Sequence, residues 1–183
     1  MRRIVLYCLL FFFVTAGIAW AASKVYVATE TVITWGDTGR THALTFSGIT
    51  SGTLRMGARH DKGSGSRAID FTYLCQLSLT GTNVPNTTTV EFWVAWSDGT
   101  MIDGGISTSD ASAASADKRN NLHLAGLLVV DQATTNTVMM ASGRFQVPTQ
   151  YFSFGFYNGS GLPMQSVTTN YCSVYPTPPE LNP

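Results

Sequence analysis

The sequence has 183 residues, of which 12% are charged, and its 11 Lys and Arg residues balance its 11 Asp and Glu residues. A chain of this length forms one domain with a proper core, and the lack of a basic excess argues against nucleic-acid binding. Gly, Ser and Thr are abundant and aromatic residues reach 11%, which is typical of an all-β domain with many turns.

Residues 1–21 differ in composition from the rest of the chain. Arg2 and Arg3 precede an apolar stretch, and Ala19 and Ala21 form a small-x-small pattern at its end. This layout predicts a secretory signal peptide that is cleaved after Ala21, and hence an exported, periplasmic or extracellular protein. The alternatives are an uncleaved membrane anchor, a misassigned start codon or a packed apolar tail. The apolar run of about 15 residues is short for a bilayer, which needs ~20.

Residues 22–175 predict a single domain built from about eight short strands. The predicted strands are 25–35, 42–47, 69–79, 89–97, 122–131, 138–147, 151–157 and 165–175. Most of them alternate apolar and polar side chains, which indicates one buried face and one wet face. Antiparallel strands with two such buried faces favour an all-β, jelly-roll-like β-sandwich.

Several segments of this domain carry more specific expectations. The stretch 48–65 is predicted as an irregular loop, and 109–120 as the one place for a short helix. The run 122–131 is almost continuously apolar, so it is either a strand buried on both sides or a helix fragment, and its valines favour the strand. Gly143 is a candidate bulge, and Asn158-Gly159 is a turn signal. Residues 176–183 predict a Pro-rich extended tail that does not join a sheet.

Two cysteines, Cys75 and Cys172, remain if the first segment is removed, because Cys8 lies within it. An even pair in an exported domain is a candidate disulfide. The two residues are equally compatible with buried thiols, since a bridge requires their strands to be neighbours with Cα atoms within ~7 Å.

Four aspartates, Asp98, Asp103, Asp110 and Asp117, lie in one loop-like run between two apolar segments. Their spacing of five to seven residues does not match a calcium loop, which places oxygen ligands much closer together. We therefore expect turn residues at the first two, a helix cap at Asp110, and an ion pair for Asp117 with a neighbouring base. The run as a whole is a candidate interface loop.

The patterns that accompany catalysis are not found in the sequence. His42, His60 and His123 are scattered, with no spacing typical of a metal site, and there is no nucleophile elbow, phosphate loop or dinucleotide fingerprint. We expect a non-enzymatic protein that needs no metal and no cofactor.

The aromatic residues offer a different hypothesis. If the side chains of Trp35, Trp93, Trp96, Tyr151 and Tyr157 are exposed, they provide flat surfaces on which sugar rings stack. On a β-sandwich such residues more often pack in the core or between subunits. An exported carbohydrate-binding module is therefore the alternative function.

Longer stretches of the domain resemble uncharacterised small virion proteins of tailed phages and prophages. The matching stretches include VYVATETVITW, GARHDKGSGSRAIDFTYLCQLSL, AWSDGTMIDGGISTSDA, DKRNNLHLAGLLVVD and ASGRFQVPTQYFSFGFYNGSG. The resemblance implies a virion structural protein of the capsid-decoration or tail-associated type, with itself or other virion proteins as partners. The leader-like residues 1–21 depart from this pattern, because virion proteins assemble in the cytoplasm.

Overall fold

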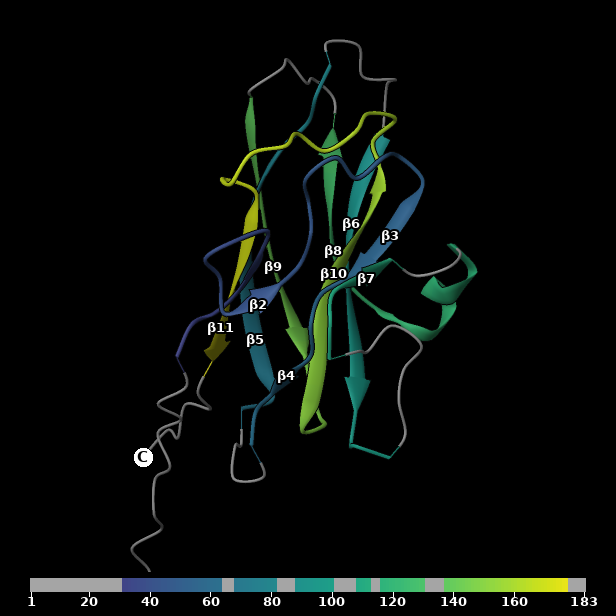
Figure 1. Cartoon of the computed structure of the whole chain (residues 1–183). Helices are drawn as coiled ribbons and strands as arrows, with labels where there is room; N and C mark the ends of the chain where they lie inside the picture. Colours follow the sequence, from purple (N-terminus) through teal and green to yellow (C-terminus); the bar gives the residue numbers. More distant parts are fainter. Residues whose placement is uncertain are drawn as a thin grey trace, which may run out of the picture. The chain divides into compact units, whose positions relative to one another are not determined.

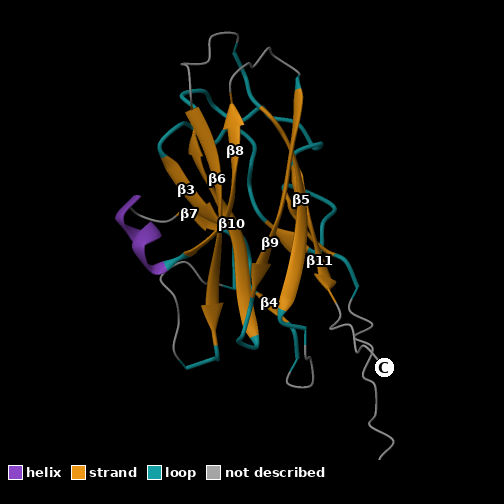
Figure 2. Ribbon diagram, turned by 180° about the vertical axis from the view of Figure 1, so that it is seen from behind, coloured by secondary structure: helices purple, strands orange, loops and turns teal. Residues whose placement is uncertain are grey.

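Two packed β-sheets make up the described part of the chain in the computed structural model (Figures 1 and 2). The structure describes residues 31–63, 68–81, 88–100, 108–112, 116–130 and 137–177, all within one unit, Ala28–Pro179. They contain eleven strands and one 3-10 helix, η1 (Ala116–Asn121). The predicted all-β sandwich is confirmed. No helix among these residues is long and apolar enough to cross a bilayer.

The five-stranded sheet has the strand order β2-β1-β11-β5-β9. Its strands are β1 (Ile33–Gly36), β2 (His42–Ala43), β5 (Asp70–Ser78), β9 (Val138–Gln146) and β11 (Tyr171–Thr177). All neighbours are antiparallel except β1 and β2, which are parallel.

The six-stranded sheet has the order β7-β3-β10-β6-β8, and β4 pairs with β10 beside this path. Its strands are β3 (Thr53–Met56), β4 (His60–Asp61), β6 (Thr88–Ser97), β7 (Ala111–Ser112), β8 (His123–Val130) and β10 (Tyr151–Gly159). Every pairing in this sheet is antiparallel.

The connections between these strands follow the jelly-roll pattern. Eight strands have four residues or more, and β2, β4 and β7 have two each. If only the eight longer strands are numbered along the chain, β1-β11-β5-β9 of the five-stranded sheet becomes 1-8-3-6. The strands β3-β10-β6-β8 of the six-stranded sheet become 2-7-4-5. This order is that of a jelly roll, which places two Greek keys face to face.

Some local expectations are corrected by the structure. The predicted loop 48–65 contains β3 and β4, and the predicted strand 165–175 is confined to β11, which starts at Tyr171. Strand β11 also runs through Pro176, opposite Phe71, so the start of the predicted tail joins the sheet. Strand 42–47 is reduced to β2, and the part of strand 25–35 before residue 31 lies outside the described residues.

The glycine and turn expectations are corrected as well. Gly143 pairs in regular register with Tyr73, and the irregularity lies in β6–β8, where Ala125 is the extra residue. Asn158 lies within β10. Its side-chain amide donates to the carbonyl oxygens of Ile49 and Leu162, so Asn158 anchors neighbouring loops and the chain turns only after Gly159.

Aromatic rings from both sheets fill the space between them. Phe154 of β10 lies 5.3 Å from Tyr73 of β5, and Phe152 lies 5.1 Å from Phe71, between ring centroids. Phe156 stacks on Phe46 at 4.6 Å. The predicted inward faces of 69–79 and 151–157 are thus confirmed, since these rings are all buried.

Tyr73 packs against two glycines, Gly143 on the neighbouring strand β9 and Gly126 on β8 in the opposite sheet. A Cβ atom at Gly143 would lie 2.6 Å from Cε1 of the Tyr73 ring, and one at Gly126 on β8 would collide with its hydroxyl. The hydroxyl is buried and has no hydrogen-bond partner among the described residues, and burial raises the pKa of Tyr73 to about 12. An unpaired buried hydroxyl costs about 1–3 kcal/mol.

We predict that Tyr73→Phe raises the free energy of unfolding by about 1 kcal/mol, because it removes this unpaired group. Gly126→Ala alone should lower it by about 1–3 kcal/mol, since the new methyl group collides with the hydroxyl. In the double variant the methyl group occupies the vacated space, so the two effects should couple by more than about 1 kcal/mol. Urea unfolding of the four proteins measures this coupling, and simple additivity would contradict the packing described.

Candidate functional site

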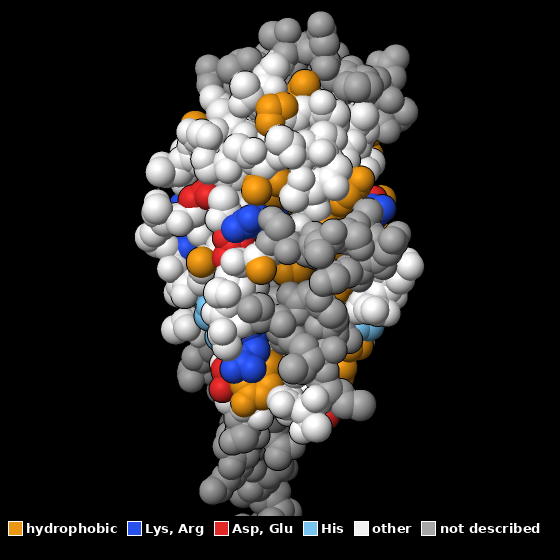
Figure 3. Space-filling model, turned by 45° about the vertical axis from the view of Figure 1, so that its right-hand side comes forward, with side chains coloured by type: hydrophobic (Ala, Val, Ile, Leu, Met, Phe, Trp, Pro, Cys, Tyr) orange, Lys and Arg blue, Asp and Glu red, His pale blue; other side chains and the backbone are white. Residues whose placement is uncertain are grey.

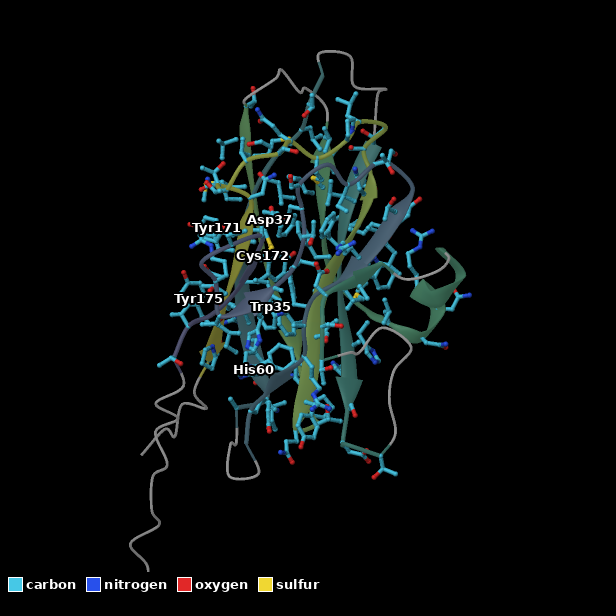
Figure 4. The ribbon with its side chains drawn as sticks, viewed as in Figure 1. Trp35, Asp37, His60, Tyr171, Cys172 and Tyr175 are labelled. Carbon is cyan, nitrogen blue, oxygen red and sulfur yellow. A yellow bond between two sulfur atoms is a disulfide. The ribbon has the colours of Figure 1, made fainter. Side chains whose placement is uncertain are left out.

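Trp35 lies in the core, so it is not part of an exposed sugar platform, the alternative that required its side chain to be exposed. Its side chain is fully buried, and the indole N–H donates to the carbonyl oxygen of Ala58 at 2.9 Å. The ring stacks on His42, with centroids 5.1 Å apart. Figure 4 shows Trp35 between the sheets, away from Tyr171 and Tyr175.

Trp93 and Tyr157 lie on the outer face of the six-stranded sheet, where Arg119 from η1 covers the Tyr157 ring. The Arg119 guanidinium lies 4.0 Å from the Tyr157 ring centroid and forms an ion pair with Glu91 at 2.8 Å. The Trp93 indole N–H donates to the same Glu91 carboxylate at 3.0 Å. Both rings also pack on a small second core, composed of Leu54, Met56, Ala95 and Leu122.

The two remaining aromatic candidates are separate from this cluster. Trp96 stacks on His123 with ring centroids 3.4 Å apart. The Arg59 guanidinium lies 4.4 Å from the Tyr151 ring centroid. The five aromatic candidates therefore do not form one exposed flat surface, because Trp35 is buried and the other four pack against neighbouring side chains.

The structure describes the side chains of two of the four aspartates, Asp98 and Asp110, and they have different roles. Asp98 accepts a hydrogen bond from the Thr100 N–H at 2.8 Å, in a turn where Gly99 has a φ of +100°, as expected for a turn residue. Asp103 and the side chain of Asp117 lie outside the described residues. No shared aspartate site is present among those that are described.

Asp110 does not cap a helix, contrary to expectation. Its carboxylate takes two hydrogen bonds from Arg55 of β3, at 2.8 Å from Nε and 2.7 Å from Nη2. It also accepts the Thr45 N–H at 3.0 Å and the Thr45 hydroxyl. This paired geometry fixes the segment before β7 against β3, because a bidentate Arg–carboxylate contact has one preferred orientation.

Basic and acidic side chains lie next to one another on the face shown in Figure 3, with hydrophobic side chains dispersed among polar ones. Among the described residues, no three His, Cys, Asp or Glu side chains gather in a way that would hold a metal ion.

Large hydrophobic side chains are exposed on the terminal strands of both sheets, and we call this set the β8–β9 edge. It consists of Leu124, Leu127 and Val129 on β8, and Val138 and Met140 on β9, whose exposed fractions run from 49% to 60%. Strands β8 and β9 each end their sheet, and they approach one another. This edge is the candidate functional site.

The strands of the β8–β9 edge lack the usual protection of an edge strand. Lysines, prolines and inward-pointing charges commonly prevent such strands from pairing with other chains. Strand β8, HLAGLLVV, contains none of these, and β9 contains a single charge, Arg144. The bulge at Ala125 distorts the first part of β8 and leaves Gly126–Val130 in regular register.

The sequence run 122–131 was expected to be a strand buried on both sides, and the structure corrects that expectation. The strand is present, but Leu127 and Val129 pair with Glu91 and Thr89 on the outer face of the six-stranded sheet. The continuous apolar character of run 122–131 was therefore the sequence feature that marked strand β8. Such a run is also compatible with a terminal strand whose outer face is covered by another protein.

A second exposed area, on the outer face of the five-stranded sheet, includes aromatic residues that the sequence did not single out. Tyr171 and Tyr175 lie on the same side of β11, and Figure 4 shows them on the outside of this sheet. Tyr175 is 39% exposed, beside the exposed side chains of Leu74 and Val32. Arg40 lies 3.9 Å from the Tyr171 ring centroid.

The structure also brings together two histidines that are 18 positions apart. The Nε2 atom of His42 lies 2.9 Å from the Nδ1 atom of His60. Burial and the charge on His42 lower the pKa of His60 to about 4, and burial lowers the pKa of His42. Spacing along the chain gave no signal for this pair, because the two residues meet only through the packing of the sheets.

Cys75 and Cys172 form a disulfide between neighbouring strands β5 and β11. They occupy directly opposite positions, with Cα atoms 4.0 Å apart, and are 97 positions apart in sequence. Both side chains are fully buried. The bond therefore connects the middle of the chain to its last strand.

Comparisons with known proteins leave the family undetermined. No family model and no curated protein matches the chain. Among solved structures, the chain is similar to one described as "EclA C-terminal domain; sugar-binding protein". That match has 9% sequence identity and a TM-score of 0.34, and covers 85% of this chain and 84% of the other. At this level of similarity it carries no argument about function.

We predict that reducing the Cys75–Cys172 bond lowers the free energy of unfolding by about 3–5 kcal/mol, because the bond closes a loop of nearly a hundred residues. Urea unfolding of the oxidised and the fully reduced protein measures the difference without altering the packed side chains. The Cys75→Ala/Cys172→Ala variant is the control, and its midpoint should not respond to reductant. Equal midpoints for the oxidised and reduced wild type would contradict a stabilising bond.

Proposed function

We propose that the protein is a non-enzymatic structural component of a phage particle, which acts through contacts of its β8–β9 edge with copies of itself or with other virion subunits. The observation that carries this proposal is the group of five half-exposed hydrophobic side chains on two terminal strands. Leu127 and Val129 lie on the outer face of the six-stranded sheet, and Val138 and Met140 lie on the outer face of the five-stranded sheet. Each terminal strand therefore offers its own row of exposed apolar side chains to a partner.

The size of the edge favours a contact that is repeated many times. Burying a large apolar side chain fully is worth about 1.5–3 kcal/mol, so five half-exposed ones contribute about 5 kcal/mol. Association costs roughly 4–15 kcal/mol in lost freedom, so this edge alone supports only a weak pair. Such contacts become effective when several act together, as in a particle with many subunits.

The fold and the disulfide agree with this proposal without deciding it. Jelly rolls occur in viral capsid proteins and in lectins, but a fold hosts many unrelated functions. A buried disulfide suits a protein that works outside the cytoplasm, either on a released particle or after export. The choice of a phage particle as the assembly rests on the resemblance of the quoted sequence stretches to small virion proteins of tailed phages.

A carbohydrate-binding role is the second candidate, and the outer face of the five-stranded sheet favours it. Tyr171 and Tyr175 are four residues apart on one strand, or about 13 Å. Sugar rings stack on exposed aromatic faces, and the half-exposed ring of Tyr175 is available for such a contact. We therefore place the candidate glycan site on this face. The five aromatic residues named from the sequence are buried or packed against other side chains.

We predict that Leu127→Lys abolishes self-association and incorporation into particles, because it places a charge in the centre of the β8–β9 edge. The matched control is Ile69→Lys, since Ile69 is 50% exposed and Leu127 53%, but Ile69 lies outside this edge. Sedimentation velocity over a concentration series and mass spectrometry of purified particles measure both properties. A wild-type protein that stays monomeric and is missing from particles would refute the structural role.

We predict that any glycan bound by the wild-type protein on an array is lost in Tyr175→Ala. The control is Tyr151→Ala, because the Tyr151 ring is already covered by Arg59. Binding that survives Tyr175→Ala, or a wild-type protein that binds no glycan, would remove the second candidate.

A further inference from the structure

The hydrogen bond between His42 and His60 joins the two sheets. His42 lies on β2 in the five-stranded sheet, and His60 lies on β4 in the six-stranded sheet. Their 2.9 Å contact lies at the opposite end of the strand order from β8 and β9. The Ala58 N–H donates to the Ala43 carbonyl oxygen at 2.8 Å beside it.

The histidine pair covers Trp35, the largest side chain of the core. The Trp35 ring stacks on His42 and meets the His60 ring edge-on, with centroids 5.1 and 6.3 Å apart. Phe152 of β10 lies 5.4 Å from His60. The rings that face the pair from β1 and β10 are therefore uncharged.

The charged groups around the pair come from one short stretch. Asp61 accepts hydrogen bonds from Gly63 and Gln150, and Arg59 lies over Tyr151. Lys62 donates to backbone carbonyl oxygens. Among the described residues, no carboxylate is hydrogen-bonded to either imidazole.

The bond between two imidazoles needs one nitrogen with a proton and one without. A neutral pair meets this condition, and so does a pair with one extra proton, because an imidazolium donates to a neutral imidazole. When both rings are charged, both facing nitrogens carry protons and the bond is lost. Two like charges then lie side by side in a half-buried place.

We propose that the His42–His60 pair is an acid-labile clasp, which holds the two sheets together over Trp35 and opens when both imidazoles are protonated. This inference is independent of the β8–β9 edge and of the proposed function.

The pKa of His60 gives the pH range and the sign. Burial first, then the charges on His42 and Lys62, lower this pKa from 6.5 to about 4, while Asp61 opposes them. Because the unfolded chain binds the proton more tightly, the clasp stabilises the fold fully above pH 6.5. Its contribution falls as the pH decreases from 6.5 towards 4. The shift permits at most a ~300-fold rise in the unfolding constant, and partial exposure of the pair reduces this.

The test compares the wild-type protein with His60→Asn between pH 7 and pH 3.5. The asparagine side chain places an oxygen or amide group where Nδ1 was, so it keeps a bond to His42 but does not titrate. The matched control is His123→Asn, which removes a histidine that stacks on Trp96, away from the clasp. Urea unfolding gives the unfolding constant, and the NMR signals of the imidazoles and of the Trp35 indole N–H report the clasp directly.

We expect His60 of the wild type to titrate near pH 4 and the Trp35 indole signal to change at the same pH. The wild type and His123→Asn should lose stability relative to His60→Asn between pH 6.5 and pH 4. An unperturbed His60 titration near 6.5, or an indole signal that stays constant while His60 is protonated, would overturn the proposal. These NMR results decide the question even if His60→Asn does not fold.

Discussion

The packing of aromatic rings between the two sheets is the interaction on which the rest of this structure depends. Phe152, Phe154 and Phe156 project from β10 at every second position. The first two meet rings of β5 in the opposite sheet, and Phe156 stacks on Phe46, which follows β2. Because these side chains alternate strictly, a slip of one residue in β10 would turn all three to the other face of the sheet and out of the core. The register of β10 therefore determines that of β3, β4 and β6, all of which pair with it.

The two long edges of this sandwich differ in chemistry. At one edge, the histidine pair, Trp35 and the β2 and β4 strands join the sheets with hydrogen bonds and ring contacts. At the other, β8 and β9 end the sheets and expose apolar side chains. The first edge is joined by contacts within the subunit, whereas the second exposes apolar side chains among the described residues. This difference is why we propose the β8–β9 edge as the contact surface.

Alternation within strands could be read from the sequence, and contacts between distant strands could not. The inward face of 69–79, from Phe71 to Leu79, followed from period-two spacing and is buried. Asp110 was expected to cap a helix, but Arg55, which lies 55 positions away, binds it. The pairing of His42 with His60 and the contact of Arg119 with the Tyr157 ring likewise depend on packing. The apolar run of β8 could be recognised in the sequence, but the exposure of its side chains depends on the terminal position of β8 in the sheet.

The position of β11 has a consequence for how this protein is made. The strand lies between β1 and β5, with neighbours on both sides, although it is synthesised after every other described strand. A nascent chain that ends before Tyr171 cannot close the five-stranded sheet, because β1 and β5 are not neighbours without β11. The sandwich therefore completes only after translation has passed residue 177, and unpaired strands remain open to aggregation until then.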